Sequence, residues 1–219
     1  PCPRAGNPFD EGGSLMIAIV DYGVGNLYSL NSSFKKVGAD TVLASDEKTL
    51  DNAEKIVLPG VGAFSDASKK LFDSGLATAL KRQVEKGKYV MGVCLGMQML
   101  FERSFEYGEY AGLGLLKGDV VPMKGYIDDG LKIPHIGWNA LRFERPHFLM
   151  QYCKEGDHVY FVHSYFATNC QDSLIATTEY GKTLTAVVGK DNVLGCQFHP
   201  EKSGKVGLNI LRAFCEKKD

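Results

Sequence analysis

Residues 89–104 read Tyr89-Val-Met-Gly-Val-Cys-Leu-Gly-Met-Gln-Met-Leu-Phe-Glu-Arg-Ser104, a short apolar run followed at once by an apolar sequence with helical spacing. This pattern predicts a strand, a sharp turn and a helix, with Cys94 in the turn between two glycines. Glycines give the backbone room for a strained turn, and the start of a helix favours a thiolate over a thiol. A cysteine in an apolar segment is more often an inert core residue, so Cys94 is a candidate nucleophile that needs partners elsewhere.

The composition of the 219-residue chain is typical of a globular protein with a sizeable core. A net charge of −1 gives no long-range attraction for nucleic acid, and no apolar stretch is long enough to cross a membrane. The six cysteines are scattered without metal-ligand spacing, so we expect free thiols, a cytoplasmic location and neither a metal nor a cofactor. Residues 1–15 lack periodicity and are expected to be a tag or disordered extension, which leaves one domain over residues 16–219.

Strands and helices alternate in the first half of this domain. Strands are predicted at 16–21, 41–44, 56–58 and 89–93, and helices at 27–37 and 63–86, the latter broken near 74–75. In the second half, strands are predicted at 120–122, 138–143, 158–166, 174–178, 185–188 and 193–198, before a helix at 206–217. The first half is typical of a mostly parallel sheet flanked by helices, and the second of an antiparallel addition, so we predict an α/β fold.

A base for the thiol is offered by His199-Pro200-Glu201, which follows the apolar strand ending at Phe198. Because Pro200 cannot join a strand ladder and disfavours α conformation before it, the tripeptide is predicted to be extended. Residues two apart in an extended segment point to the same side, so the Glu201 carboxylate can reach the imidazole. Alone, the tripeptide better fits a surface histidine beside a solvated glutamate. With Cys94 in the same domain, it suggests a Cys-His-Glu triad.

Acyl transfer also needs N–H donors for the developing oxyanion. The N–H of Leu95 is one candidate, because this residue follows the nucleophile at the start of the helix. Gly60-Val61-Gly62 is another, since the loop ends the preceding strand, where open α/β sheets bind ligands; a plain strand-to-helix turn is the alternative. Gly23-Val24-Gly25 lacks the third glycine of a dinucleotide fingerprint, and no Walker loop is present, so no nucleotide site is predicted.

The combined motifs resemble those of class I glutamine amidotransferases over residues 16–217. The motifs of this wider family are Pro59-Gly-Val-Gly62, Gly92-Val-Cys-Leu-Gly-Met-Gln98 and His199-Pro-Glu201. Within the family, the chain is most similar to the glutaminase subunits of imidazole glycerol phosphate synthase. The motifs for that narrower match are Asp21-Tyr-Gly-Val-Gly-Asn26, Pro59-Gly-Val-Gly-Ala-Phe64, Pro134-His-Ile-Gly-Trp-Asn139 and Phe161-Val-His-Ser-Tyr165. The resemblance implies a flavodoxin-like open sheet.

This resemblance also implies an activity, the hydrolysis of glutamine to glutamate and ammonia without a cofactor. It implies a catalytic triad of Cys94, His199 and Glu201, and an oxyanion hole that involves Leu95, Val61 and Gly62. The substrate-binding residues that it implies are Gly60, Gly62, Gln98, Glu106, Ser164 and Tyr165. Without the resemblance, Gln98 and Glu106 are better interpreted as ordinary polar residues on a helix and in a loop.

The resemblance further implies a partner, the (β/α)8-barrel cyclase subunit of the synthase. In this family the cyclase receives ammonia through an interior channel and makes imidazole glycerol phosphate and AICAR in histidine biosynthesis. The family's glutaminases are usually slow until the partner binds its ligand. Asn26, Trp138 and Lys202 match positions near that interface, although Trp138 equally fits a core.

Two other hypotheses remain open at this point. The chain could be a glutaminase subunit for another synthase, one that makes pyridoxal phosphate or amidates a surface sugar, because the triad does not specify the acceptor. It could also be a non-catalytic, flavodoxin-like regulatory module, in which case Cys94 has no chemical role. None of the three hypotheses involves nucleic acid or a membrane.

Overall fold

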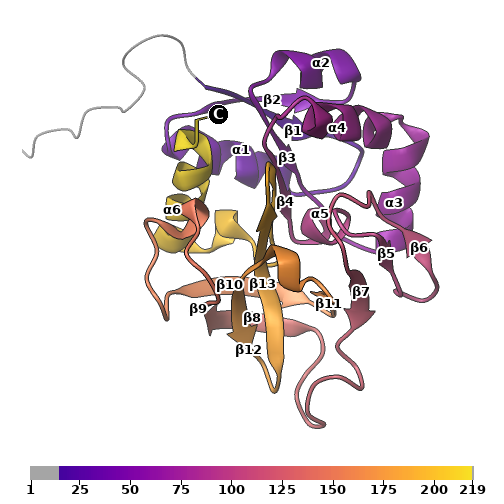
Figure 1. Ribbon diagram of the computed structural model, residues 1–219, viewed down its shortest axis with the longest axis vertical. Coiled ribbons are helices and arrows are strands. Elements are labelled where there is room, and N and C mark those ends of the chain that lie inside the picture. Colours follow the sequence, from indigo (N-terminus) through magenta and orange to yellow (C-terminus); the bar gives the residue numbers. More distant parts are fainter. Residues whose placement is uncertain (1–14, 219) are drawn as a thin grey trace, which may run out of the picture.

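The computed structural model describes residues 15–218, and its main feature is a twisted sheet with the strand order β2-β1-β3-β4-β14-β13-β12-β9 (Figure 1). The first five strands in this order are parallel. They are β2 (Asp40–Ala44), β1 (Met16–Val20), β3 (Lys55–Leu58), β4 (Val90–Val93) and β14 (Val193–Cys196). The antiparallel strands are β13 (Thr183–Lys190), β12 (Leu174–Glu179) and β9 (Arg142–Phe143). This arrangement confirms the predicted α/β fold with its antiparallel addition.

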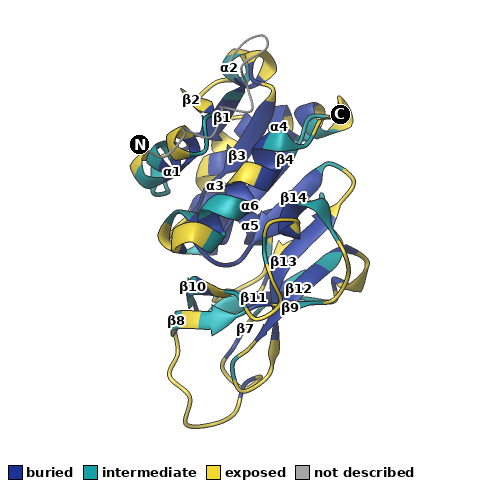
Figure 2. Cartoon of the chain, turned by 90° about the vertical axis from the view of Figure 1, so that its left-hand side faces the viewer, coloured by how far each residue is buried: buried dark blue, intermediate teal, exposed yellow. Residues whose placement is uncertain are grey.

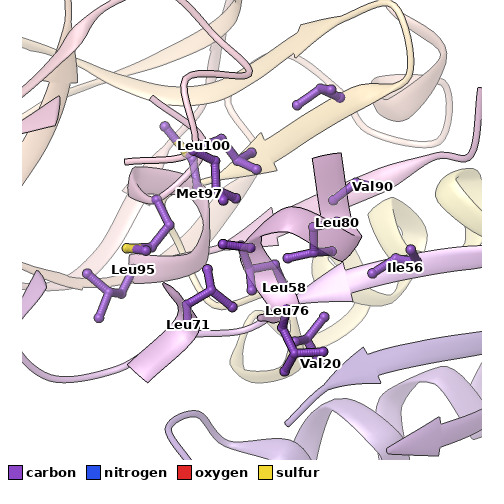
Figure 3. Packing of buried hydrophobic residues seen from close by; sticks show 14 of the residues in the cluster. Val20, Ile56, Leu58, Leu71, Leu76, Leu80, Val90, Leu95, Met97 and Leu100 are labelled. Carbon is purple, nitrogen blue, oxygen red and sulfur yellow. The ribbon is translucent and has the colours of Figure 1, made fainter. Parts of the chain in front are cut away.

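Helices cover both faces of the parallel part of the sheet. One face is covered by α1 (Leu27–Lys36) and α6 (Gly204–Glu216), and the other by α2 (Glu47–Asn52), α3 (Phe64–Asp73) and α4 (Leu76–Glu85). Phe34 of α1 and Phe214 of α6 pack against each other, with their ring centroids 6.4 Å apart. On the opposite face, Leu71 and Leu80 join the cluster of buried side chains drawn in Figure 3. Burial therefore concentrates on the strands and on the inner sides of the helices (Figure 2).

Two smaller sheets lie at one end of the main sheet (Figure 1). One pairs β8 (His135–Ala140) with β10 (His158–His163), and the other has the order β11-β7-β5-β6. Its strands are β11 (Tyr165–Thr168), β7 (Asp119–Pro122), β5 (Arg103–Ser104) and β6 (Tyr110–Ala111). The short helical turns of the chain are α5 (Leu95–Gln98), η1 (Phe148–Met150), η2 (Gln171–Ser173) and η3 (Pro200–Lys202). A hydrogen bond from the His199 N–H to the Tyr160 carbonyl, at 3.0 Å, joins β10 to the segment after β14.

Two predicted strands are interrupted in the structure. The strand predicted at 138–143 breaks at Leu141, whose N–H bonds to Asp157, and its two parts enter different sheets as β8 and β9. The strand predicted at 158–166 breaks at Ser164, which separates β10 from β11. Each break lets one chain segment serve two sheets, and this requirement is set by partners that are distant in sequence.

Two helices also differ from expectation. The helix after Cys94 is only the single turn α5, because the N–H groups of Leu113 and Leu115 bond to the carbonyls of Met99 and Leu100. These tertiary bonds replace the continuation of the helix. Helix α2 was not predicted, although Asp46 caps it by accepting from the Thr49 N–H at 2.8 Å.

The expected extension at residues 1–15 lies outside the described residues except for Leu15. This side chain is buried and belongs to the core on the α1 and α6 face. Within residues 15–218, no helix has both the length and the apolar character that crossing a bilayer requires.

Candidate active site

The candidate site lies at the carboxyl edge of the main sheet, where three neighbouring parallel strands end. β3 leads into the glycine loop, which we define as residues 59–62, β4 leads into Cys94, and β14 leads toward His199. The Cys94 N–H donates to the Cys196 carbonyl at 2.8 Å and so ties the ends of β4 and β14 together. Because adjacent parallel strands end at the same edge, residues about a hundred positions apart in the sequence meet there.

Cys94 occupies the sharp turn that the sequence predicts. Its φ of 55° and ψ of −114° are rare for a residue with a side chain, so the backbone is strained at this position. The two flanking glycines make the turn possible. A Cβ atom on Gly96 would lie 1.8 Å from the Leu58 carbonyl oxygen, and one on Gly92 would lie 2.6 Å from the Gly96 oxygen. The turn can therefore pack against β3 only without a side chain at Gly96, and α5 can pack over β4 only without one at Gly92.

The side chains of Cys94, His199 and Glu201 come together in the structure. His199 Nδ1 lies 2.8 Å from Glu201 Oε1, and both side chains are almost fully buried. Burial by itself lowers the pKa of His199, but hydrogen bonds to Cys94 and Glu201, together with their negative charges, outweigh it and raise that pKa to about 9. The imidazole is therefore cationic at neutral pH and is held between Cys94 and Glu201.

The His199-Pro200-Glu201 segment is not extended throughout, so this part of the prediction is wrong. His199 is extended, but Pro200 begins the turn η3, which the Lys202 N–H closes on the His199 carbonyl at 3.0 Å. Proline is favoured at the first position of a helical turn, because its missing N–H would have no partner there. The turn brings Glu201 back toward His199, so the predicted contact forms through a different backbone path.

A cavity of about 690 Å³ opens beside Cys94, and most of the predicted site residues line it. They are Val61, Gly62, Cys94, Leu95, Gln98, Glu106, Ser164, Tyr165, His199 and Lys202. Gly60 is not among the lining residues and packs against α5, since a Cβ atom on it would be 2.7 Å from the Gly96 nitrogen. Tyr22 holds the start of the glycine loop, because its hydroxyl donates to the Pro59 carbonyl at 2.7 Å. The strand break at Ser164 exposes that residue to the cavity.

Gln98 and Glu106 both make specific contacts. The Gln98 amide nitrogen donates to the Tyr165 carbonyl and to Gln197 Oε1, each at 3.0 Å. Both of its hydrogens are used in this way, so the polar atom that Gln98 offers to a ligand is its acceptor, Oε1. Glu106 Oε2 accepts from the Phe64 N–H at 2.6 Å, at the first residue of α3. Gln98 lies on α5 and Glu106 in a loop, as the alternative interpretation also expects, but the sequence did not predict these contacts.

Sequence reasoning assigned no role to two buried residues of the site, Gln197 and His163. Gln197 is fully buried, and its Nε2 lies 3.9 Å from Cys94 Sγ. His163 lines the cavity and bonds through Nδ1 to the Tyr165 carbonyl at 2.9 Å. Burial lowers the pKa of His163 to about 3, so this imidazole is neutral. For Gln197 the available signal was its position two residues before His199, on the same side of an extended segment.

The residues matched to a partner interface lie on the surface. Trp138 is 52% exposed, so its interpretation as a core residue is wrong. Its ring meets that of Tyr160 edge-on with centroids 6.0 Å apart, and Lys202 Nζ lies 5.8 Å from the Tyr160 ring centre. Asn26 caps α1 by accepting from the Ser29 N–H at 3.4 Å. Trp138, Tyr160 and Lys202 therefore form one exposed group, which we call the aromatic face.

The nucleophile turn, the buried His–Glu pair and the parallel sheet that carries them define a class of protein. Residues 18–218 match the family model described as "Glutamine amidotransferase class-I", and the chain belongs to this family of glutamine-hydrolysing enzymes.

Its relatives include two proteins named imidazole glycerol phosphate synthase subunit HisH. The relative from Caldanaerobacter subterraneus subsp. tengcongensis is 50% identical, with 92% of this chain and 98% of the relative covered. The relative from Lactococcus lactis is 46% identical, with 91% and 98% covered.

Solved structures of similar fold share less sequence. The structure of PurLQS from Thermotoga maritima aligns with a TM-score of 0.70 at 20% identity, covering 92% of this chain and 97% of that one. A putative GMP synthase subunit from Thermoplasma acidophilum aligns with a TM-score of 0.69 at 19% identity, covering 94% of each chain. These likenesses support the fold.

Proposed function

We propose that this chain is the glutaminase subunit of imidazole glycerol phosphate synthase, which releases ammonia from glutamine and passes it to a (β/α)8-barrel cyclase subunit. The observation that carries the proposed chemistry is the hydrogen-bonded array of Cys94, His199 and Glu201 beside the 690 Å³ cavity. The relatives' names support the narrower assignment, at 46–50% identity over more than nine tenths of this chain.

In the proposed reaction, the Cys94 thiolate attacks the side-chain amide carbon of glutamine. The cationic His199 then donates its proton to the departing nitrogen, the C–N bond breaks, and ammonia and a glutamyl thioester remain. His199, now neutral, accepts a proton from water as the water attacks the thioester, which releases glutamate and restores the thiolate–imidazolium pair. Glu201 holds the imidazole in position through its 2.8 Å contact with Nδ1.

The oxyanion formed by thiolate attack needs donors close to Cys94. The N–H of Leu95 begins α5, and Val61 and Gly62 line the same cavity from the glycine loop. Tyr22 holds this loop at Pro59, and Glu106 holds Phe64, two residues after the loop, at the start of α3. We propose that Leu95 and the glycine loop together form the oxyanion hole.

We assign substrate recognition to polar side chains that line the cavity. Gln98 offers an acceptor oxygen, and Glu106 carries a negative charge, so both suit the α-ammonium group of glutamine. Ser164 and Tyr165 line the same cavity from the junction of β10 and β11, and the Tyr165 carbonyl accepts from Gln98 at 3.0 Å. We propose that this junction contacts the backbone portion of the substrate.

The aromatic face is the proposed docking surface for the cyclase, together with Asn26. Ile136 lies two residues before Trp138 on β8 and is 58% exposed, so an apolar strip continues along this strand. Lys202 lies both on this face and in the cavity lining, which supports a docking surface beside the glutaminase site.

The first experiment tests the nucleophile. Glutamate release is measured with the cyclase subunit of Caldanaerobacter subterraneus and its nucleotide ligand present, for the wild type, Cys94→Ala and Cys153→Ala. We expect Cys94→Ala to lower the rate by at least about a thousandfold, because Cys94 supplies the thiol that lines the cavity and forms the thioester. Cys153 is half-buried away from the cavity lining, so its variant should keep the wild-type rate. Equal rates for the wild type and Cys94→Ala would favour the non-catalytic hypothesis.

A second experiment tests the acceptor. Ammonia transfer is followed with the imidazole-pathway cyclase and, in parallel, with synthases that make pyridoxal phosphate or amidate a surface sugar. We expect this chain to support glutamine-dependent product formation by the cyclase and by none of the other synthases. Stimulation by another synthase and not by the cyclase would refute the narrow assignment while leaving the glutaminase intact.

A further inference from the structure

We infer that Gln197 is a further catalytic residue, which donates a hydrogen bond to the Cys94 sulfur and holds it in place for attack. The inference rests on the proposed function, because it requires Cys94 to be the nucleophile. Gln197 is fully buried, and its Nε2 lies 3.9 Å from Sγ, within reach of an N–H···S hydrogen bond. Burying an amide costs free energy unless its polar atoms are hydrogen-bonded, and both ends of the Gln197 amide have partners.

The backbone directs Gln197 toward the site. Its N–H donates to the Ala186 carbonyl at 2.9 Å, so the strand-like pairing of β14 with β13 continues through this residue. Residues two apart in such a segment point to the same side, and His199 is the next residue on that side. Gln197 and His199 therefore approach the Cys94 sulfur from one segment, as two separate donors.

The orientation of the Gln197 amide follows from its neighbours. The Tyr165 carbonyl can only accept, so the Gln98 group that faces it at 3.0 Å must be the nitrogen. The same nitrogen lies 3.0 Å from the Gln197 side chain, which must therefore present its oxygen there. The Gln197 nitrogen is left to face Cys94. The Tyr165 carbonyl thus fixes the orientation of the Gln98 amide, and the Gln98 amide fixes that of the Gln197 amide, so that an N–H group faces the sulfur.

This donor has a chemical consequence for the sulfur. Cys94 Sγ also lies 3.9 Å from the Val162 carbonyl oxygen, which can accept from a thiol but repels a thiolate. The Gln197 N–H acts in the opposite direction, because it stabilises negative charge on sulfur. It also connects the nucleophile to Gln98, which lines the cavity, so a ligand that moves Gln98 also moves the donor.

Two substitutions separate the donor from the packing of the side chain. Gln197→Glu keeps the shape and an acceptor for Gln98 but turns an oxygen toward the sulfur, whereas Gln197→Leu removes both polar contacts. We expect Gln197→Glu to lower kcat by about a hundredfold, and Gln197→Leu by about tenfold, with smaller changes in KM. The matched control is Gln83→Leu. Gln83 is a second fully buried amide, which bonds to Asp51 on the α2–α4 side, and its variant should stay within about twofold of wild type.

A second readout detects the sulfur directly. The rate at which iodoacetamide alkylates Cys94, measured by peptide mass mapping across pH 6 to 10, should fall in both Gln197 variants, with the profile displaced to higher pH. A third measurement uses the wild-type protein, so no substitution can affect folding. The side-chain amide NMR signal of Gln197 should shift when Cys94 is alkylated. The Gln83 signal should stay in place.

The outcomes distinguish this inference from the proposed function. If alkylation of Cys94 inactivates the wild type while folded Gln197→Glu reacts and turns over at the wild-type rate, the Gln197 role is wrong and the glutaminase assignment stands. An unmoved Gln197 signal in the alkylated wild type overturns the role in the same way. If alkylation of Cys94 leaves glutamate release unchanged, the proposed function itself fails.

Discussion

The carboxylate of Glu106 accepts a hydrogen bond from the backbone N–H of Phe64, with Oε2 2.6 Å from the nitrogen. Phe64 begins α3, and Ala63 before it has no side chain that could cap the helix. Glu106 therefore supplies a cap from a distant loop while it also lines the cavity. One side chain thus connects the proposed ammonium site to the start of α3, two residues after the glycine loop.

This double contact predicts different effects for two substitutions of Glu106. Glu106→Gln keeps an acceptor for Phe64 but removes the charge, so we expect KM for glutamine to rise about tenfold while kcat is largely kept. Glu106→Ala also releases the start of α3, so kcat should fall about tenfold as well. Steady-state kinetics of the complex with the cyclase measure both values. A wild-type KM for Glu106→Gln would argue against the ammonium role.

Because Gly96 packs closely against Leu58, we expect a side chain at Gly96 to destabilise the fold. An alanine at Gly96 would place its Cβ 1.8 Å from the Leu58 carbonyl oxygen, in a fully buried position of β3. We expect Gly96→Ala to lower the free energy of unfolding by about 3 kcal/mol or more, because neither backbone can move freely. Gly114 has a positive φ but open space around its Cβ position, so Gly114→Ala should cost only about 1 kcal/mol. Urea unfolding compares the two variants.

Lys55 links β3 to the last helix, α6, and we expect this link to stabilise the fold. Its buried ammonium group donates to the carbonyls of Phe214 at 2.6 Å and Cys215 at 3.0 Å, and also to that of Lys217, at the end of α6. We expect Lys55→Met to cost about 2 to 3 kcal/mol, because carbonyls at the helix end lose a charged donor.

A matched control for Lys55 exists at the end of α2. Lys88 donates to the carbonyls of Leu50 and Asp51 in the same manner, but it is more exposed. Lys88→Met should therefore cost no more than about 1 kcal/mol in the same thermal or urea melts. Equal losses for the two variants would show that burial does not control the strength of this cap.

We expect His147 to make the free energy of unfolding depend on pH. Its Nδ1 accepts from the Leu149 N–H at 3.2 Å, and burial, with the nearby charge of Arg145, lowers its pKa to about 4. The folded state therefore prefers the neutral imidazole. The His147 contribution is fully present above the unfolded pKa of about 6.5 and is lost as pH falls toward 4.

The measurement for His147 is a comparison of unfolding free energies at pH 7 and pH 4. His147→Asn keeps an oxygen acceptor for the helical turn but does not titrate in this range. We expect the wild type to lose about 1 to 2 kcal/mol more than His147→Asn, after allowance for solvent screening of a half-buried group. Parallel pH curves for the two proteins would contradict the predicted titration.

Much of the fold follows from local sequence patterns. The apolar runs that form β1, β3 and β4, and the break between α3 and α4 at Ser74-Gly75, were predictable because each depends on neighbouring residues. The breaks at Leu141 and Ser164 were not predictable. Each depends on hydrogen bonds or sheet partners from distant segments, which no local pattern records.

The sequence by itself determined the turn at Cys94, because the flanking glycines and the switch from strand to helix are local properties of residues 89–104. It also determined that His199 and Glu201 would be close to each other. Only the tertiary structure decided that these two meet Cys94, since adjacency of β4 and β14 results from sheet pairing between segments a hundred residues apart. Tertiary packing likewise placed Gln197 beside the sulfur and the Glu106 carboxylate at the start of α3, because both contacts join distant segments.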